Sequence, residues 1–343
     1  MYRVTRIGSR ILQAFAILLA VAICAQAASN VQTFSLTDAK DLVLVNVKAA
    51  IVEYNGRKCV RLTNDTKKDG FALLRGTEGF QDGTIQADVA LKIAMPPPPF
   101  RMPGFVGIAF RSQPDASHYD LFYWRPGNAH SDDQLIRNHS VQYISKPDFD
   151  WYKLRYEWPS VYESYAPLKF GTWVRVRIEV KGRTAELYLN GSQNPSLVVD
   201  PLLGQSLRGG VALWPYPDEE AYFSKVRITN SMPMPVKNGS DASGMWQVTF
   251  SSDVGSFHGT LQLKRDGSKL TGTWSGDLGH GRTITGTWRD GYVDLSFDAQ
   301  WKFPHLQGQS PAALAGWIDG DSAHGHMKVE GLTSGRWTAT RKP

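Results

Sequence analysis

The sequence has very little cysteine. Its 343 residues include two, Cys24 and Cys59, and Cys24 lies in an N-terminal segment that we expect to be removed. The cysteine that remains cannot form an internal disulfide, so the hydrophobic core must stabilise the folded state. Cys59 itself, in the apolar-flanked run KCVRL, is predicted to be buried.

A strong excess of charge of one sign is also absent. The formal net charge is +6, and loss of the N-terminal Arg3, Arg6 and Arg10 leaves 35 basic against 32 acidic residues, a net of +3. This balance argues against nucleic acid as the main partner. No P-loop, dinucleotide-binding glycine fingerprint, paired Cys-x-x-Cys or Gly-x-Ser-x-Gly motif occurs, so no signature of those site types is present.

Long hydrophobic runs are missing, apart from one near the N-terminus. Three arginines precede the apolar run 11–24, which is followed by Ala25-Gln26-Ala27. A membrane anchor is the alternative, but the run is short of the roughly 20 apolar residues that a spanning helix needs. The order of segments is typical of a signal peptide. We therefore predict that residues 1–27 are cleaved near Ala27, that the protein is secreted or periplasmic, and that no membrane attachment remains.

What the chain contains is mostly β-strand signal. Val174, Val176, Ile178 and Val180 alternate with polar residues, and the next ribbon, TAELYLNG, ends in a turn pair. Many such short ribbons predict an all-β fold, with an antiparallel jelly-roll sandwich over residues 28–230. The segment 231–243, SMPMPVKNGSDAS, has the composition of a linker.

A repeat follows the linker. Leu270-x-Gly272-x-Trp274 recurs as Ile284-x-Gly286-x-Trp288, within about eight predicted strands. Eight strands can close a small barrel, and inward glycines suit strongly coiled strands. We predict an up-and-down β-barrel over residues 244–343, which resembles avidin- and lipocalin-like barrels. Its interior is predicted to be filled by Trp246, Leu270, Trp274, Ile284, Trp288, Val293, Leu295 and Trp337.

Aromatic residues are concentrated between His118 and Trp173, where 14 of 56 positions are Phe, Tyr or Trp, against 11% for the chain. Within this stretch, RNHSVQY (137–143) is predicted to be a strand with binding groups on both faces. Rings that stack on sugars, beside polar groups that bond hydroxyls, are typical of a carbohydrate site. The alternative is a structural role, in which the rings pack long loops against the sandwich.

Several of these ribbons together resemble a known family. Together they are similar to exported bacterial concanavalin-like and laminin-G-like jelly rolls, and also resemble keto-disaccharide hydrolase-like domains. The runs that carry the resemblance are DGTIQADVAL, GFVGIAFR, YDLFYWRP, RNHSVQY, WVRVRIEV, AELYLNG, GVALW and AYFSKVRIT. The resemblance implies a ligand face on one sheet and its bordering loops. Alternation puts Gly107, Ala109 and Arg111 on one face of their strand. The predicted ligand-binding residues are Arg111, Tyr123, Arg125, Arg137, Asn138, His139, Tyr143 and Trp151.

The first hypothesis is therefore a protein that binds a carbohydrate or glycoconjugate, and two others stay open. One is a glycoside hydrolase or lyase that uses acids of the 148–163 loop, with Glu157, Glu163 and His139 as its catalytic residues. The Glu-x-Asp-x-(x)-Glu motif of concanavalin-like glucanases is missing, and solvated or ion-paired acids explain the same residues. The other is a structural or protein-binding module. Two acids and His139 in one pocket would favour the enzyme.

No cofactor is predicted, although calcium stays open because laminin-G-like domains often bind it. Asp132-Asp133 and Asp218-Glu219-Glu220 could supply carboxylate ligands from loops. His324 and His326 alternate with an apolar set, so we expect them on the exposed face of a barrel strand with Lys328 and Glu330, without a metal.

Overall fold

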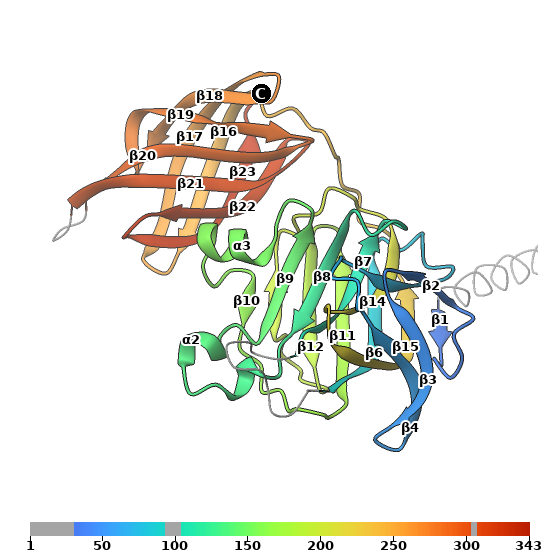
Figure 1. Ribbon diagram of the computed structural model, residues 1–343. Coiled ribbons are helices and arrows are strands. Elements are labelled where there is room, and N and C mark those ends of the chain that lie inside the picture. Colours follow the sequence, from blue (N-terminus) through green and yellow to red (C-terminus); the bar gives the residue numbers. More distant parts are fainter. Residues whose placement is uncertain (1–30, 93–103, 303–306) are drawn as a thin grey trace, which may run out of the picture.

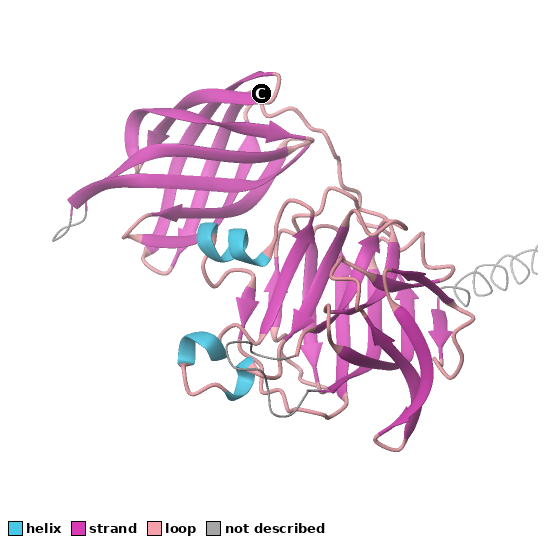
Figure 2. Cartoon of the chain, viewed as in Figure 1, coloured by secondary structure: helices cyan, strands magenta, loops and turns pink. Residues whose placement is uncertain are grey.

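The structure, a computed structural model, describes residues 31–92, 104–302 and 307–343. The predicted signal peptide, residues 1–27, lies outside these ranges. Figure 2 shows strands joined by loops, with only a few short helices, which confirms the all-β prediction. Within the described ranges, no helix is both long and apolar enough to cross a membrane. The short helices named below are η2 (Asn128–His130), α2 (Gln134–Arg137) and α3 (Trp151–Glu157).

The N-terminal half is a sandwich of two antiparallel sheets (Figure 1). The first has eight strands, in the spatial order β13 (Leu197–Val199), β12 (Thr184–Leu189), β11 (Val174–Lys181), β6 (Gly83–Lys92), β15 (Glu220–Asn230), β4 (Arg57–Thr63) and β3 (Lys48–Tyr54), with β1 (Val31–Phe34) beside β15. The second has seven, in the order β10 (Glu163–Ser164), β9 (Val141–Lys146), β8 (Tyr119–Trp124), β7 (Val106–Ser112), β14 (Gly210–Pro215), β5 (Phe71–Leu74) and β2 (Leu42–Val45).

Residue alternation explains why these strands pack as layers. On β11 the side chains of Val174, Val176, Ile178 and Val180 are buried, while Arg175 is exposed, as predicted. Successive side chains of a strand point to opposite faces, so one face of β11 enters the core between the sheets. The strands β7 and β8 are buried along their whole length, which means that both faces of the seven-stranded sheet are covered there.

The C-terminal part is a closed eight-stranded barrel, as predicted. Seven of the eight predicted interior residues are at most 1% exposed, whereas Trp288 is only partly buried and donates from Nε1 to the Ser240 carbonyl oxygen at 3.0 Å. A Cβ atom at Gly272 would lie 1.9 Å from the Gln262 carbonyl oxygen, so this close approach requires glycine. The strands in order are β16 (Gly244–Ser252), β17 (Gly255–Asp266), β18 (Lys269–Gly276), β19 (Gly279–Arg289), β20 (Tyr292–Lys302), β21 (Gln307–Asp319), β22 (Ser322–Val329) and β23 (Thr333–Arg341).

The barrel packs against the sandwich beside α3 (Figure 1). Ion pairs join Arg289 to Asp148 at 2.7 Å and Arg336 to Asp200 at 2.9 Å. The Trp317 indole nitrogen donates to the Leu202 carbonyl oxygen at 2.8 Å, and its side chain is part of the sandwich core cluster. The two parts therefore share an apolar and ionic interface.

His324 and His326 lie at this interface, which corrects their expected exposed position. Both do point out of the barrel, but His324 contacts Asp200 at 3.5 Å and the His326 ring packs 5.6 Å from the Tyr162 ring. Burial lowers the pKa of His326 to about 4. The outward face of a barrel strand is normally exposed to solvent, whereas here the sandwich covers it.

Residues 137–140 are not a strand, which corrects a second prediction. Arg137 ends α2, Asn138 is its C-cap, and β9 begins only at Val141. The Asp133 side chain accepts a hydrogen bond from the Leu135 backbone nitrogen at 2.8 Å and so caps the helix start. Because the segment is the end of a helix followed by a turn, its alternating polar residues do not form two strand faces.

Candidate functional site

A cavity of about 370 Å³ lies on the face of the seven-stranded sheet that points away from the other sheet; we call it the outer cavity. Strand pairing puts Tyr123 of β8 opposite Gly107 of β7, and Gly107 opposite Trp214 of β14, so these residues share one face. The outer cavity is lined by Lys67, Asp69, Phe105, Tyr123, Arg125, Ile144, Lys146, Asp150, Trp151, Arg155, Trp214, Tyr216 and Pro217.

Aromatic rings form much of the cavity wall. The rings of Phe105 and Tyr216 stack with centroids 4.6 Å apart, and those of Tyr123 and Trp214 lie 5.6 Å apart. Trp151, at the first turn of α3, is 44% exposed. The side chain of Asp150 accepts from the Trp151 backbone nitrogen at 2.8 Å and fixes the start of this helix. The site thus combines rings held by packing with one ring open to solvent.

One end of the outer cavity is cationic. Arg125 is 7% exposed, and its Nη2 donates to the Tyr123 hydroxyl at 3.0 Å and to the Gln142 side-chain oxygen. Arg155, from α3, donates from Nη2 to Glu163 Oε2 at 2.7 Å. The Arg155–Glu163 pair brings α3 onto β10, so the helix that carries Trp151 is bonded to the edge of the sheet.

At the other end of the outer cavity, the ammonium group of Lys146 forms ion pairs with two carboxylates. Lys146 Nζ lies 2.7 Å from Asp150 Oδ2 and 3.4 Å from Asp69 Oδ2. Burial acts to lower the pKa of Lys146, but the hydrogen bond to Asp150 and the charge of Asp69 outweigh it, and the net pKa is raised. Lys146 therefore stays charged and neutralises part of this acidic end.

Three of the eight predicted ligand residues, Tyr123, Arg125 and Trp151, meet in the outer cavity. Arg111 does not, because its backbone φ is +50° and the pairing of β7 with β14 shifts beside it. This bulge breaks the alternation that predicted its direction. Its guanidinium is buried, with Nη2 at 3.1 Å from Asp82 Oδ1 and 2.6 Å from the Gly182 carbonyl oxygen, and so ties the two sheets together.

Tyr143 is also outside the outer cavity. It is fully buried on the opposite face of the sheet, where its hydroxyl donates to Asp120 Oδ1 at 2.6 Å and accepts from the Leu203 backbone nitrogen at 2.8 Å. Burial raises the pKa of Asp120 and of Tyr143. Both residues hold the 203–206 segment against the sheet.

Of the remaining predicted ligand residues, none lines the outer cavity. Arg137 donates from Nη1 to the carbonyl oxygens of Ser131 and Asp132, at 2.7 and 2.9 Å, and Asn138 is exposed at the end of α2. His139 Nδ1 lies 2.9 Å from Glu163 Oε2. Burial lowers the pKa of His139, although the Glu163 charge opposes the shift. His139 thus contacts Glu163, the same carboxylate that binds Arg155 at the cationic end of the cavity.

The two acids named for the alternative enzyme hypothesis, Glu157 and Glu163, are not brought together. Glu163 is buried and bound by Arg155 and His139, whereas Glu157 is on the barrel side of α3, where burial and the nearby Asp294 raise its pKa. Asp148 pairs with Arg289 of the barrel. Of the acids in the 148–163 loop, the outer cavity is lined by Asp150 alone.

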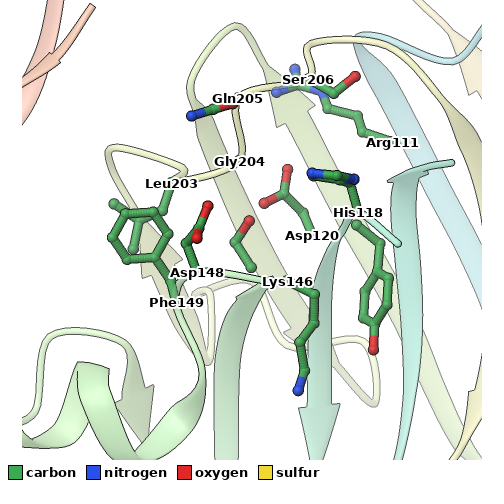
Figure 3. A pocket seen from close by; sticks show the side chains of 12 residues that line it. Arg111, His118, Asp120, Lys146, Asp148, Phe149, Leu203, Gly204, Gln205 and Ser206 are labelled. Atoms are coloured by element: carbon green, nitrogen blue, oxygen red, sulfur yellow. The ribbon is translucent and has the colours of Figure 1, made fainter. Parts of the chain in front are cut away.

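A second, much smaller cavity lies on the opposite face, between Asp120, His118 and the 203–206 segment (Figure 3). Its volume is about 20 Å³, which suits roughly one water molecule. A Cβ atom on Gly204 would lie 2.6 Å from Asp120 Oδ1, so the segment sits directly on the carboxyl. This cavity is too small for a sugar ring.

The two loops for which calcium was left open have other contacts. Asp133 caps α2, and Glu220 lies 3.4 Å from Lys92 Nζ. Glu219 accepts from the Gly104 backbone nitrogen at 3.1 Å. Across the described ranges, no group of three or more His, Cys, Asp or Glu side chains is placed to hold a metal ion.

Sequence reasoning missed several cavity residues, above all Trp214, Phe105, Lys146 and Asp69. Trp214 is in the ribbon GVALWPY, which was recognised as a strand. The strand that contains Trp214, β14, pairs with β7, which is about 100 residues earlier in the sequence. No local pattern reveals such a pairing, but the small residue Gly107, on a strand of the predicted ligand face, was a usable signal.

No family model matches the chain, and no curated protein matches its sequence. Solved structures with a similar arrangement include carbohydrate-binding module CBM66 from Bacillus subtilis, with 16% identity, a TM-score of 0.37, and coverage of 54% of this chain and 97% of that one. A Bacillus subtilis protein of unknown function with a galectin-like fold has 12% identity, a TM-score of 0.40, and coverage of 59% and 96%. Domains LG4-5 of the mouse laminin alpha1 chain have 11% identity, a TM-score of 0.23, and coverage of 86% and 80%.

Proposed function

We propose that this chain binds a carbohydrate, free or as part of a glycoconjugate, in the outer cavity. The observation that carries the proposal is the lining of that cavity, where aromatic rings and charged hydrogen-bonding groups converge. Its volume of about 370 Å³ falls in the general range of small-molecule sites, about 300–1,000 Å³.

The aromatic wall suits the C–H faces of a sugar ring. Trp151 offers an exposed ring at the mouth, while Trp214 and Tyr123 are buried and held by neighbouring rings. Rings already fixed by packing lose little freedom when a ligand stacks on them, so less of the binding free energy is spent on ordering them.

The polar groups suit hydroxyls. Asp69 and Asp150 present carboxylate acceptors, and Arg155 and Lys146 present donors, from both ends of one cavity. A sugar hydroxyl both donates and accepts, so a ring between these ends can satisfy both kinds of group. The acids are tied to Lys146, which favours binding over acid–base catalysis.

The test is retention on a glycan array by the full chain and by Trp151→Ala. If Trp151 stacks on the sugar, its removal should weaken binding by about 1.5–3 kcal/mol, the scale for burying a large apolar side chain. The matched control is Tyr156→Ala, on the same helix, since Tyr156 is 86% exposed and does not line the outer cavity.

Equal retention by wild type and Trp151→Ala, with both proteins folded by thermal melting, would contradict the assignment of the cavity. Absence of any glycan binding by the wild-type chain would contradict the function itself.

We also propose that the protein acts outside the cytoplasm, as a secreted or periplasmic protein. The support is the N-terminal order of basic, apolar and small residues in 1–27. The mature protein should begin near residue 28 on N-terminal sequencing, and a mature chain that begins at Met1 would exclude cleavage.

A further inference from the structure

Arg125 is a buried cation whose charge has no carboxylate partner in the described part of the chain. The residue as a whole is 7% exposed, and no carboxylate oxygen of a described residue lies within 4.0 Å of its guanidinium nitrogens. Its Nη2 bonds go to two neutral groups, the Tyr123 hydroxyl and the Gln142 side-chain oxygen. Its Nε is buried and has no hydrogen-bond partner among the described residues.

The two partly buried cations of the outer cavity, Lys146 and Arg155, are matched by carboxylates. Lys146 contacts the two carboxylates Asp69 and Asp150, and Arg155 contacts Glu163. Lys67 is exposed to solvent, where an unpaired charge costs little. Arg125 is therefore the exception within the cavity lining.

An unpaired buried charge is costly, and the fold only partly offsets that cost. The Arg125 guanidinium carbon lies 5.1 Å from the Tyr123 ring centroid and 5.4 Å from that of Phe105, so the ring faces attract it weakly. Such contacts and two neutral acceptors do not replace the bidentate carboxylate that a guanidinium prefers. The missing anion would have to come from the cavity that Arg125 lines.

Resting on the sugar-binding function proposed above, we propose that the outer cavity selects sugars that carry an anionic group, a carboxylate or a sulfate ester, and that Arg125 binds this group. The cavity is polarised to suit such a sugar. The anionic group of the sugar would lie at the Arg125 end of the cavity, near Arg155. The hydroxyls of the sugar would face Asp69 and Asp150 at the other end.

The test compares charged and neutral forms of the same glycans on the wild-type chain. Oligosaccharides of polygalacturonate, alginate and hyaluronan are each measured beside their carboxyl-reduced forms, and keratan sulfate, whose repeating disaccharide has no carboxylate, is measured beside its desulfated form. We expect at least one charged form to bind about 10-fold or more tightly than its neutral counterpart. Which pair shows the difference distinguishes a carboxylate from a sulfate ester.

Two variants separate specific recognition from general attraction to a basic surface. Arg125→Gln should remove the preference for the charged form. Arg175→Gln removes the same charge from an exposed position on β11, in the other sheet, and should keep the preference. Arg125→Lys keeps the charge without the planar fork and should retain only part of the preference. Thermal melting confirms that each variant is folded.

Neutral glycans that bind as tightly as their charged forms would overturn this inference and leave the sugar-binding proposal standing. Equal loss of preference in Arg125→Gln and Arg175→Gln would also overturn it. No binding by any member of either set, and none on the glycan array, would contradict sugar binding as a whole. Because the wild-type comparison needs no variant, the inference stays testable even if Arg125→Gln does not fold.

Discussion

The barrel interior and the outer cavity of the sandwich are both built from aromatic residues on antiparallel strands, yet one is filled and the other is open. Inside the barrel, Trp246, Trp274 and Trp337 are at most 1% exposed and pack with aliphatic side chains. In the outer cavity, rings of similar size stand beside Arg125, Lys146 and two aspartates around about 370 Å³ of space.

The difference shows what separates a core from a site. Aromatic content alone does not distinguish the two regions. Where the rings are packed against other apolar side chains, as in the barrel, they stabilise the fold. Charged groups that remain buried among rings are costly to keep, and their presence beside open space is the basis on which we propose that the outer cavity binds a ligand. The barrel also supports the site indirectly, because it contacts the face of α3 opposite to Trp151 and Arg155.

The largest effect is expected inside the barrel. Trp274 is 0% exposed and stacks on Phe297 with centroids 5.3 Å apart, so Trp274→Ala should lower the free energy of unfolding by about 3–5 kcal/mol. Chemical denaturation measures this change. The exposed neighbour Thr273→Ala serves as the control, with a change within about 0.5 kcal/mol. Equal stabilities would mean that the barrel interior is not the packed core described here.

A loss of similar size is expected at Arg111, on stability and not on binding. Arg111→Ala leaves the buried Asp82 carboxylate without its cation, which should cost about 3–5 kcal/mol of unfolding free energy. Arg175→Ala, at an exposed position, is the control with a change within about 0.5 kcal/mol. Loss of glycan retention by a well-folded Arg111→Ala protein would return this residue to the binding site.

A smaller, pH-dependent effect is expected where the barrel meets the sandwich. Burial lowers the pKa of His326 to about 4, below its ordinary value, so the unfolded state takes up the proton first as the pH falls. The free energy of unfolding should therefore decrease between about pH 6 and 5, at a slope approaching about 1.4 kcal/mol per pH unit for this group.

His139 contributes in the same direction, because its pKa is also lowered by burial. His326→Gln and His139→Gln separate the two contributions when unfolding is measured across this pH range. A slope that is unchanged in His326→Gln would show that the interface does not keep His326 neutral.

Strand alternation made much of the fold predictable from the sequence. The alternating Val174 to Val180 ribbon and the Leu-x-Gly-x-Trp repeat carry their side-chain directions in the local pattern, and the structure confirms both. Tyr123, Arg125 and Trp151 were predicted as site residues by local composition, and the structure brings these three together.

The rest depended on features that act across the chain or break the local period. The bulge at Arg111 reverses the expected direction of one side chain, and the pairing of β14 with β7 brings Trp214 next to Gly107. The helix α2 replaced the expected strand because Asp133 caps it. The strand prediction rested on the alternation in RNHSVQY, and Asp133, four residues before it, was not considered as a helix cap.

The most direct test of the central claim is a crystal structure of the full chain with the tightest-binding oligosaccharide of the charged and neutral pairs. The account predicts a sugar in the outer cavity, in contact with Trp151 and with its anionic group at Arg125. A sugar bound to the barrel or to the outer face of the eight-stranded sheet, with no sugar in the outer cavity, would contradict it.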